Sequence, residues 1–201
     1  MIIAVASLKG GVGKTTTAIH LAAYLQSQAN TLLIDAELNR SATEWAKRGN
    51  LPFEVVDEWH PPSEDQHFDH VVIDTQAKPT VPEMRVLTES CDLLILLTTT
   101  DILAIDALIR VLEVLKAIAF TRYRILLTGV PNKPSRDVEQ LQLMLKEAGL
   151  PLFATTIRQM AIIYRATQTG SLVSEVKDPK AQEAWEDYQR MGQELLANFG
   201  L

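Results

Sequence analysis

Apolar, β-branched runs alternate along the chain with segments whose apolar residues recur at helical spacing. The runs predict strands at residues 2–7, 31–35, 53–57, 70–74, 92–98, 122–130 and 152–155. The helical spacing predicts helices at residues 14–28, 42–48, 82–90, 103–119, 135–148, 160–169 and 179–199. The strand runs are continuously apolar, which is typical of strands covered on both faces. We therefore expect an α/β fold with a doubly wound, mostly parallel sheet and helices on both faces.

Length and composition agree with one domain spanning residues 1–201, since no interdomain linker or repeat interrupts the pattern. The longest apolar run, at residues 93–97, is far too short to cross a membrane. The single cysteine, Cys91, excludes an internal disulfide and a multi-cysteine metal site, as expected of a cytoplasmic protein.

The net charge of −6 argues against a strongly basic nucleic-acid binder. The charge is unevenly distributed, because residues 1–119 carry 9 basic and 16 acidic groups and residues 120–201 carry 10 and 9. Any contact with a polyanion is therefore expected in the second half of the chain.

A glycine-rich loop follows the first predicted strand, in the sequence LKGGVGKTTTAIHLAAYL at residues 8–25. Such a loop places backbone N–H groups and the start of a helix against phosphate oxygens. Lys14 is expected to neutralise the β- and γ-phosphates, and the Thr15 hydroxyl to bind Mg²⁺. The strict P-loop pattern fails at its first position, where Leu8 replaces glycine, and a second lysine, Lys9, lies just inside the loop.

Three acidic residues follow other predicted strands. Asp35 ends the second strand with Glu37 close behind it, and Asp74 ends the fourth. Because ligands bind beyond the carboxyl ends of parallel strands, we expect these residues to meet the glycine-rich loop at one edge of the sheet.

These motifs together resemble the ParA/MinD superfamily of P-loop ATPases, and in particular its small ParA members. KGGVGKTT at residues 9–16 matches the deviant Walker A box of that family. LLIDAELNRSAT at residues 32–43 and VVIDTQAKP at residues 71–79 are similar to its next two motifs, in the same order. The resemblance implies ATP as the nucleotide and Mg²⁺ as the metal. It places the cofactor-binding residues of the loop at Lys9, Gly10, Gly11, Val12, Gly13, Lys14, Thr15 and Thr16.

The resemblance also implies roles for the charged residues. Lys9 acts across a homodimer interface on the phosphates of the partner subunit, and Lys14 acts on those of its own. Asp74 with Thr15 belongs to the Mg²⁺ site, and Asp35 helps to order the metal shell. A second cation near the γ-phosphate stabilises the charge that gathers there during transfer, so hydrolysis and dimerisation become coupled.

The sequence departs from the family pattern beside the site. Glu37 stands where the family has an aspartate that orients the attacking water, so Glu37 is the expected catalytic carboxylate of a slow ATPase. Leu38 and Asn39 replace Pro-Gln, and Gln76 and Lys78 replace prolines. These changes leave open a regulator that binds nucleotide but has lost hydrolysis.

The resemblance implies further contacts in the second half of the chain. Backbone groups near residues 130–132, with Asn132, are placed for the adenine, and no N-K-x-D box selects guanine. Non-specific DNA of the nucleoid is expected to meet Arg158 and Arg165, which lie two helical turns apart if one helix holds both. Lys133, Lys177 and Lys180 are further candidates for phosphate contacts.

The resemblance leads to an ATP-dependent dimer that positions cargo over the nucleoid, through a separate adaptor or cargo-bound protein that stimulates hydrolysis. The cargo is a plasmid, a chromosomal locus or a protein body such as the carboxysome. The C-terminal segment carries an acidic helical face, so we expect it to pack on the sheet and not to bind membrane. The alternative is a P-loop enzyme that couples ATP hydrolysis to a small-molecule or metal-insertion reaction.

Overall fold

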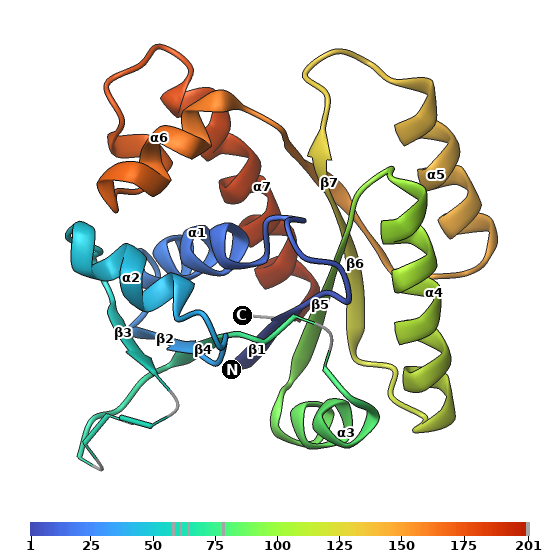
Figure 1. Ribbon diagram of the computed structural model, residues 1–201, viewed down its shortest axis with the longest axis horizontal. Coiled ribbons are helices and arrows are strands. Elements are labelled where there is room, and N and C mark those ends of the chain that lie inside the picture. The colour runs from blue at the N-terminus through green and yellow to red at the C-terminus, as the bar shows by residue number, and fades with distance from the viewer. Residues whose placement is uncertain (58, 61, 64, 78, 200–201) are drawn as a thin grey trace.

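A seven-stranded sheet forms the centre of the protein in the computed structural model (Figure 1). The structure describes residues 1–57, 59–60, 62–63, 65–77 and 79–199. The strands lie in the order β3-β2-β4-β1-β5-β6-β7, and every neighbouring pair is parallel. From β1 the chain forms β2, β3 and β4, which lie on one side of β1 in the strand order. It then forms β5, β6 and β7 on the other side of β1. The expected doubly wound α/β fold is therefore confirmed, with a fully parallel sheet.

The strands of this sheet are β1 Ile2–Ala6, β2 Thr31–Asp35, β3 Glu54–Asp57, β4 His70–Asp74, β5 Leu93–Thr98, β6 Tyr123–Val130 and β7 Leu152–Arg158. The helices are α1 Lys14–Gln26, α2 Ser41–Arg48, α3 Val81–Ser90, α4 Ile102–Ala117, α5 Arg136–Glu147, α6 Ala161–Thr169 and α7 Ala181–Phe199. A short 3₁₀ turn, η1, covers Val173–Glu175.

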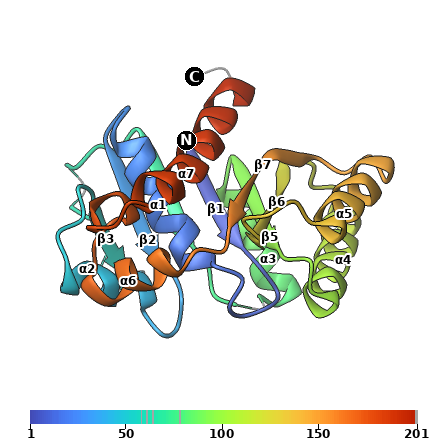
Figure 2. The ribbon, with the colours of Figure 1, turned by 90° about the horizontal axis from the view of Figure 1, so that it is seen from above.

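The helices cover the sheet on both faces, with α1, α2, α6 and α7 on one side and α3, α4 and α5 on the other (Figure 2). Successive residues of β1 point to opposite faces, so Ile3 and Val5 pack under α1 while Ala4 and Ala6 pack under α4. This two-sided burial explains why the strands are continuously apolar in the sequence.

Helix α7 packs against α1 and β7, as the apolar spacing of the C-terminal segment predicts. Tyr188, Met191 and Leu195 are buried on its inner face. A Cβ added to Gly192 would lie 2.1 Å from the Tyr24 ring of α1, so only glycine allows this close approach. The side chain of Phe199 lies outside the described residues. Among the helices that the structure describes, none has the length and hydropathy to span a bilayer.

His20 lies on the buried face of α1. Its ring stacks on Tyr188 with centroids 4.4 Å apart. Nε2 accepts a hydrogen bond from the Val173 N–H, which leaves Nδ1 to donate to the Thr16 carbonyl. Burial lowers the pKa of His20 to about 4, partly offset by the bond to Thr16. The imidazole is therefore neutral at pH 7 and links α1, η1 and α7.

One sequence expectation about the seventh strand is wrong. The strand does not end at residue 155 but continues to Arg158, and α6 begins only at Ala161. Arg158 and Arg165 therefore do not share a helix. Thr156 and Arg158 continue the pairing with β6, and the Arg158 N–H donates to Asp187 of α7. These contacts are tertiary, and no local pattern encodes them.

Candidate functional site

The three strands that carry the acidic residues are neighbours in the sheet. Asp35 at the end of β2 lies in register with Asp74 at the end of β4, and Val5 of β1 pairs with Asp74 on its other side. The glycine-rich loop leaves β1 at this same edge. The predicted convergence of the loop with both aspartates is therefore observed.

The loop reaches α1 through two left-handed glycines. Gly11 has φ 78° and Gly13, the N-cap of α1, has φ 86°. A Cβ at either position would meet nothing within 4 Å, so the requirement for glycine comes from the backbone angle alone. Gly13 offers no side-chain cap and the first turn of α1 holds no acidic residue. The first N–H groups of α1 therefore remain free for an anion.

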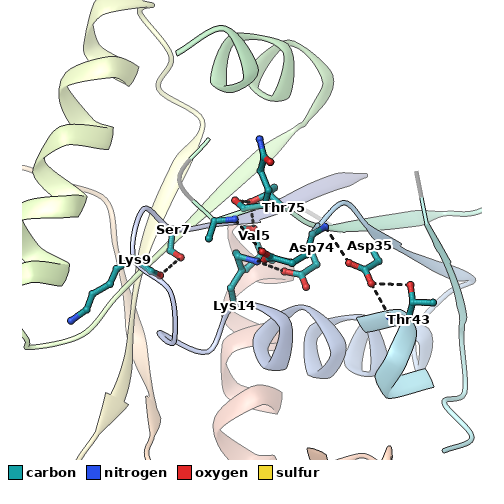
Figure 3. A network of polar contacts seen from close by, with 11 residues as sticks. Val5, Ser7, Lys9, Lys14, Asp35, Thr43, Asp74 and Thr75 are labelled. Atoms are coloured by element: carbon teal, nitrogen blue, oxygen red, sulfur yellow. Dashed lines mark hydrogen bonds and ion pairs between the residues drawn. The ribbon is translucent and has the colours of Figure 1, made fainter. Parts of the chain in front are cut away.

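Lys14 lies at the centre of the site, at the first position of α1, and is only 7% exposed. Its ammonium donates to Asp74 Oδ1 over 3.0 Å and contacts Glu37 Oε2. Figure 3 shows Lys14 beside Asp74, with Asp35 beyond them. The two carboxylates balance the lysine charge and hold it below the loop.

Asp74 is fully buried. Burial raises the pKa of its carboxyl, and the charge of Lys14 and a hydrogen bond from Thr15 counteract that rise. Oδ2 of Asp74 has no hydrogen-bond partner among the described residues. An unpaired carboxylate oxygen beside a threonine hydroxyl matches the oxygen ligands that Mg²⁺ takes next to a nucleotide. The described residues hold no cluster of three or more His, Cys, Asp or Glu that would bind a metal without phosphate oxygens.

Both oxygens of Asp35 are engaged by protein donors. Oδ1 accepts from the Glu37 N–H at 3.2 Å, and Oδ2 accepts from the N–H and the hydroxyl of Thr43, each at 2.8 Å (Figure 3). Asp35 thus fastens the start of α2 and the Glu37 backbone to the end of β2. We expected Asp35 to order the metal shell. Its bonds position the Glu37 backbone and Thr43 beside the site.

Lys9 points away from Lys14, as Figure 3 shows. Its ammonium pairs with Asp101 Oδ1 at 2.6 Å. Asp101 is the N-cap of α4 and accepts the Leu103 N–H at 2.8 Å. The bond from Lys9 lowers the pKa of this carboxyl. Both side chains are partly exposed, so the pair lies at the surface beside the loop.

Two hollows flank the glycine-rich loop. One, of about 610 Å³, extends from the loop over Glu37 and α2 to Arg48. The other, of about 730 Å³, extends over the ends of β5, β6 and β7 to α6. Lys9, Gly11, Gly13 and Thr16 line both, so the loop forms the ridge between them.

The second hollow lies beside the turn that was expected near the adenine. Among the residues that line it are Gly129, Met160 and Tyr164, whereas Asn132 is exposed on the turn after β6 and is not part of this lining. Sequence reasoning missed Met160 and Tyr164, because one reads as an apolar residue at the start of a helix and the other as part of its apolar face. The 68% exposure of Tyr164 is the feature that marks it, and only the structure gives it.

The two arginines expected at DNA have different environments. The Arg158 guanidinium is 20% exposed and bonds to Asp187 at 2.8 Å and to the Glu183 carbonyl at 2.7 Å. The hydrogen bond to Asp187 raises its pKa. Arg165 is 62% exposed and pairs with Asp178 at 2.8 Å. Arg158 is thus part of the α7 packing, and only Arg165 presents its charge to solvent. Lys78 lies outside the described residues.

Comparison with known proteins agrees with this site. A sequence profile of the CobQ/CobB/MinD/ParA nucleotide binding domain matches residues 3–173. The chain is 33% identical to the Maintenance of carboxysome distribution protein A of Gloeobacter kilaueensis, over 96% of this chain and 93% of that protein.

Two solved structures share the fold. A plasmid partition protein from Borrelia burgdorferi bound to AMPPNP has a TM-score of 0.76 at 18% identity, with 98% of each chain covered. An ATP complex of a substituted McdA from Cyanothece has a TM-score of 0.72 at 20% identity, over 96% of this chain and 95% of that one. The loop, the paired strand-end aspartates and the length of the match to the profile lead to one assignment: the chain belongs to the CobQ/CobB/MinD/ParA nucleotide-binding family, whose ParA/MinD branch consists of ATPases.

Proposed function

We propose that the protein is an ATPase that forms an ATP-dependent homodimer and positions cargo over nucleoid DNA. The observation that carries the proposal is the arrangement of the two lysines. Lys14 is buried against the aspartate of the metal site, while Lys9 leaves the same loop toward the surface. A surface lysine at a phosphate loop is suited to the nucleotide of a second subunit.

ATP fits the ridge between the two hollows. The phosphates bind the N–H groups of residues 10–16 and the Lys14 ammonium, and the base lies in the hollow beside Met160 and Tyr164. The Thr15 hydroxyl and Asp74 Oδ2 would hold Mg²⁺, which would supply positive charge to the terminal phosphates. Glu37 lines the hollow on the other side of the loop, where its carboxylate can orient a water.

The exposed residues around Lys9 support the proposal that a second subunit covers this face. Ile102 and Leu103 follow Asp101 in the first turn of α4 and are 66% and 63% exposed. Apolar side chains of this size beside a ligand site are typical of a surface that a partner covers. In the dimer, Lys9 leaves Asp101 and reaches the phosphates of the other subunit.

Arg165 is the residue that best supports DNA contact. Its ion pair with Asp178 brings the turn that holds Lys177 and Lys180 next to α6, and both lysines are exposed. An exposed arginine therefore lies beside a turn with two exposed lysines, which suits a DNA backbone. Arg158 is not included, because Asp187 and Glu183 neutralise it.

The relatives suggest the cargo. The similarity to a carboxysome distribution protein extends over nearly the whole chain, and plasmid partition proteins share the fold. We propose that the cargo is a carboxysome or a plasmid, reached through an adaptor protein.

Light scattering with Mg²⁺ and ATP, compared with ADP, tests the proposal. A dimer is expected only with ATP, and Lys9→Ala is expected to remain monomeric while still binding ATP. A monomer under every condition, with ATP demonstrably bound, would contradict the sandwich and favour an enzyme acting on a small substrate.

A further inference from the structure

The Glu37 carboxylate joins three segments around the glycine-rich loop. Oε2 contacts the Lys14 ammonium of α1, and Oε1 faces the Ala77 N–H of the loop after β4 at 3.5 Å. Its own N–H is held by Asp35 of β2. The side chain is 13% exposed, so it is enclosed where these segments meet.

A phosphate oxygen that binds Lys14 competes with the carboxylates that hold it now. Two of the three N–H donors of the ammonium already point to carboxylates in a nearly closed space, so a phosphate would bring a third anionic group against one cation. Asp74 is fully buried at the end of a central strand. Glu37 lies on a loop beyond the end of β2, so Glu37 is the partner that can leave.

We propose that the Glu37 carboxylate binds the Lys14 ammonium in place of a phosphate oxygen in the nucleotide-free protein, and that ATP displaces it. This inference rests on the proposed function of the site. Displacement releases the carboxylate toward the reacting water and frees the Ala77 segment in the same event. Binding of nucleotide is thereby linked to rearrangement of the two loops beside the metal site.

The length of the side chain is part of the proposal. Glutamate is one methylene longer than aspartate. Asp35 holds the backbone of Glu37 in place. From there, the longer side chain lets the carboxylate reach the ammonium of Lys14. Shortening the side chain while keeping its charge should therefore weaken the competition with phosphate.

The test is titration of the purified protein with Mg²⁺ and AMPPNP by calorimetry, for wild type, Glu37→Gln, Glu37→Asp and Glu44→Gln. Glu44 lines the same hollow but pairs with Lys47, so it controls for general repulsion between the hollow and phosphate. We expect Glu37→Gln to bind AMPPNP about fivefold or more tightly, since one charge-assisted contact no longer competes. Glu37→Asp should lie between Glu37→Gln and wild type, and Glu44→Gln should match wild type.

Urea denaturation without nucleotide gives a second readout. Glu37→Gln should unfold at a lower urea concentration than wild type, because the nucleotide-free variant lacks the ion pair between Glu37 and Lys14. A merely structural role would lower both stability and affinity together.

Unchanged or weaker AMPPNP binding by Glu37→Gln would overturn the inference. An Asp variant with the affinity of wild type would also overturn it, since simple repulsion depends on charge and not on reach. If wild type and variants alike bind no AMPPNP, the proposed function fails and the inference fails with it. Binding by wild type with no effect at Glu37 refutes the inference alone.

Discussion

Lys9 and Lys14 lie on one loop, yet their ammonium groups are held by separate carboxylates on opposite sides of it. Lys14 donates to Asp74 at 3.0 Å inside the site, and Lys9 pairs with Asp101 at 2.6 Å at the surface. This arrangement supports the proposed roles, in which Lys14 binds the nucleotide of its own subunit and Lys9 reaches that of a partner.

Removing Asp101 and removing Lys9 should have different effects. Asp101→Ala deletes the N-cap of α4, so we expect the free energy of unfolding to fall by about 1 kcal/mol. ATP-dependent dimerisation should persist, because Lys9 leaves this partner in the dimer. Lys9→Ala should do the reverse, with little change in urea denaturation and no dimer by light scattering. Loss of the dimer in both variants would contradict a role for Lys9 that is independent of Asp101.

Replacing Asp74 by asparagine should separate folding from metal binding. Burial raises the pKa of this carboxyl in the folded protein. The free energy of unfolding therefore falls as the pH rises through that pKa and the buried carboxyl ionises. Asp74→Asn should therefore keep or raise the free energy of unfolding by about 1 kcal/mol at pH 7, because Lys14 keeps Glu37. Mg²⁺ should no longer strengthen ATP binding, as measured by calorimetry with and without the metal. A loss of more than about 2 kcal/mol would show that Lys14 depends on Asp74 for its charge balance.

His20 should make the protein acid-sensitive in a defined range. Its folded pKa of about 4 lies below the ordinary value of 6.5. The stability it contributes is therefore fully present above pH 6.5 and is lost as the pH falls toward 4, at about 1.4 kcal/mol per pH unit.

Urea denaturation at several values between pH 7 and pH 4 checks this expectation. His20→Phe keeps an aromatic ring against Tyr188 but cannot take up a proton. The variant should be less stable than wild type at pH 7, because two hydrogen bonds are lost, and should lose less stability on acidification. Parallel curves for the two proteins would refute the assignment.

Charge changes at the two arginines should affect different properties. Arg165→Glu should abolish ATP-dependent retention on DNA with little change in stability, since its charge is exposed. Arg158→Gln should destabilise the protein by about 2 kcal/mol, because the buried Asp187 keeps only Arg190 as a guanidinium partner. Co-sedimentation with DNA and urea denaturation separate the two results. Retention of DNA by Arg165→Glu would move the DNA contact to another surface.

Much of the fold was predictable because its signals are local. Continuous apolar runs predicted buried parallel strands, and the spacing of Tyr188, Met191 and Leu195 predicted a packed C-terminal helix. The predicted boundary failed at β7, where pairing with β6 continues to Arg158 and the Arg158 N–H donates to Asp187 of α7.

Some features of the candidate site were also predictable from the sequence, and others depend on the tertiary structure. The sequence alone determined the phosphate loop and the edge at which Asp35 and Asp74 meet it. Glycine is the residue that adopts the positive φ of the loop, and the carboxyl ends of parallel strands share one edge. Only the tertiary structure decided which partner holds each charge. Lys9 meets Asp101 from 92 residues away, Arg158 is neutralised from α7, and Glu37 reaches Lys14 across two loops. Ion pairs between distant residues depend on how layers pack, and packing leaves no periodic mark in the chain.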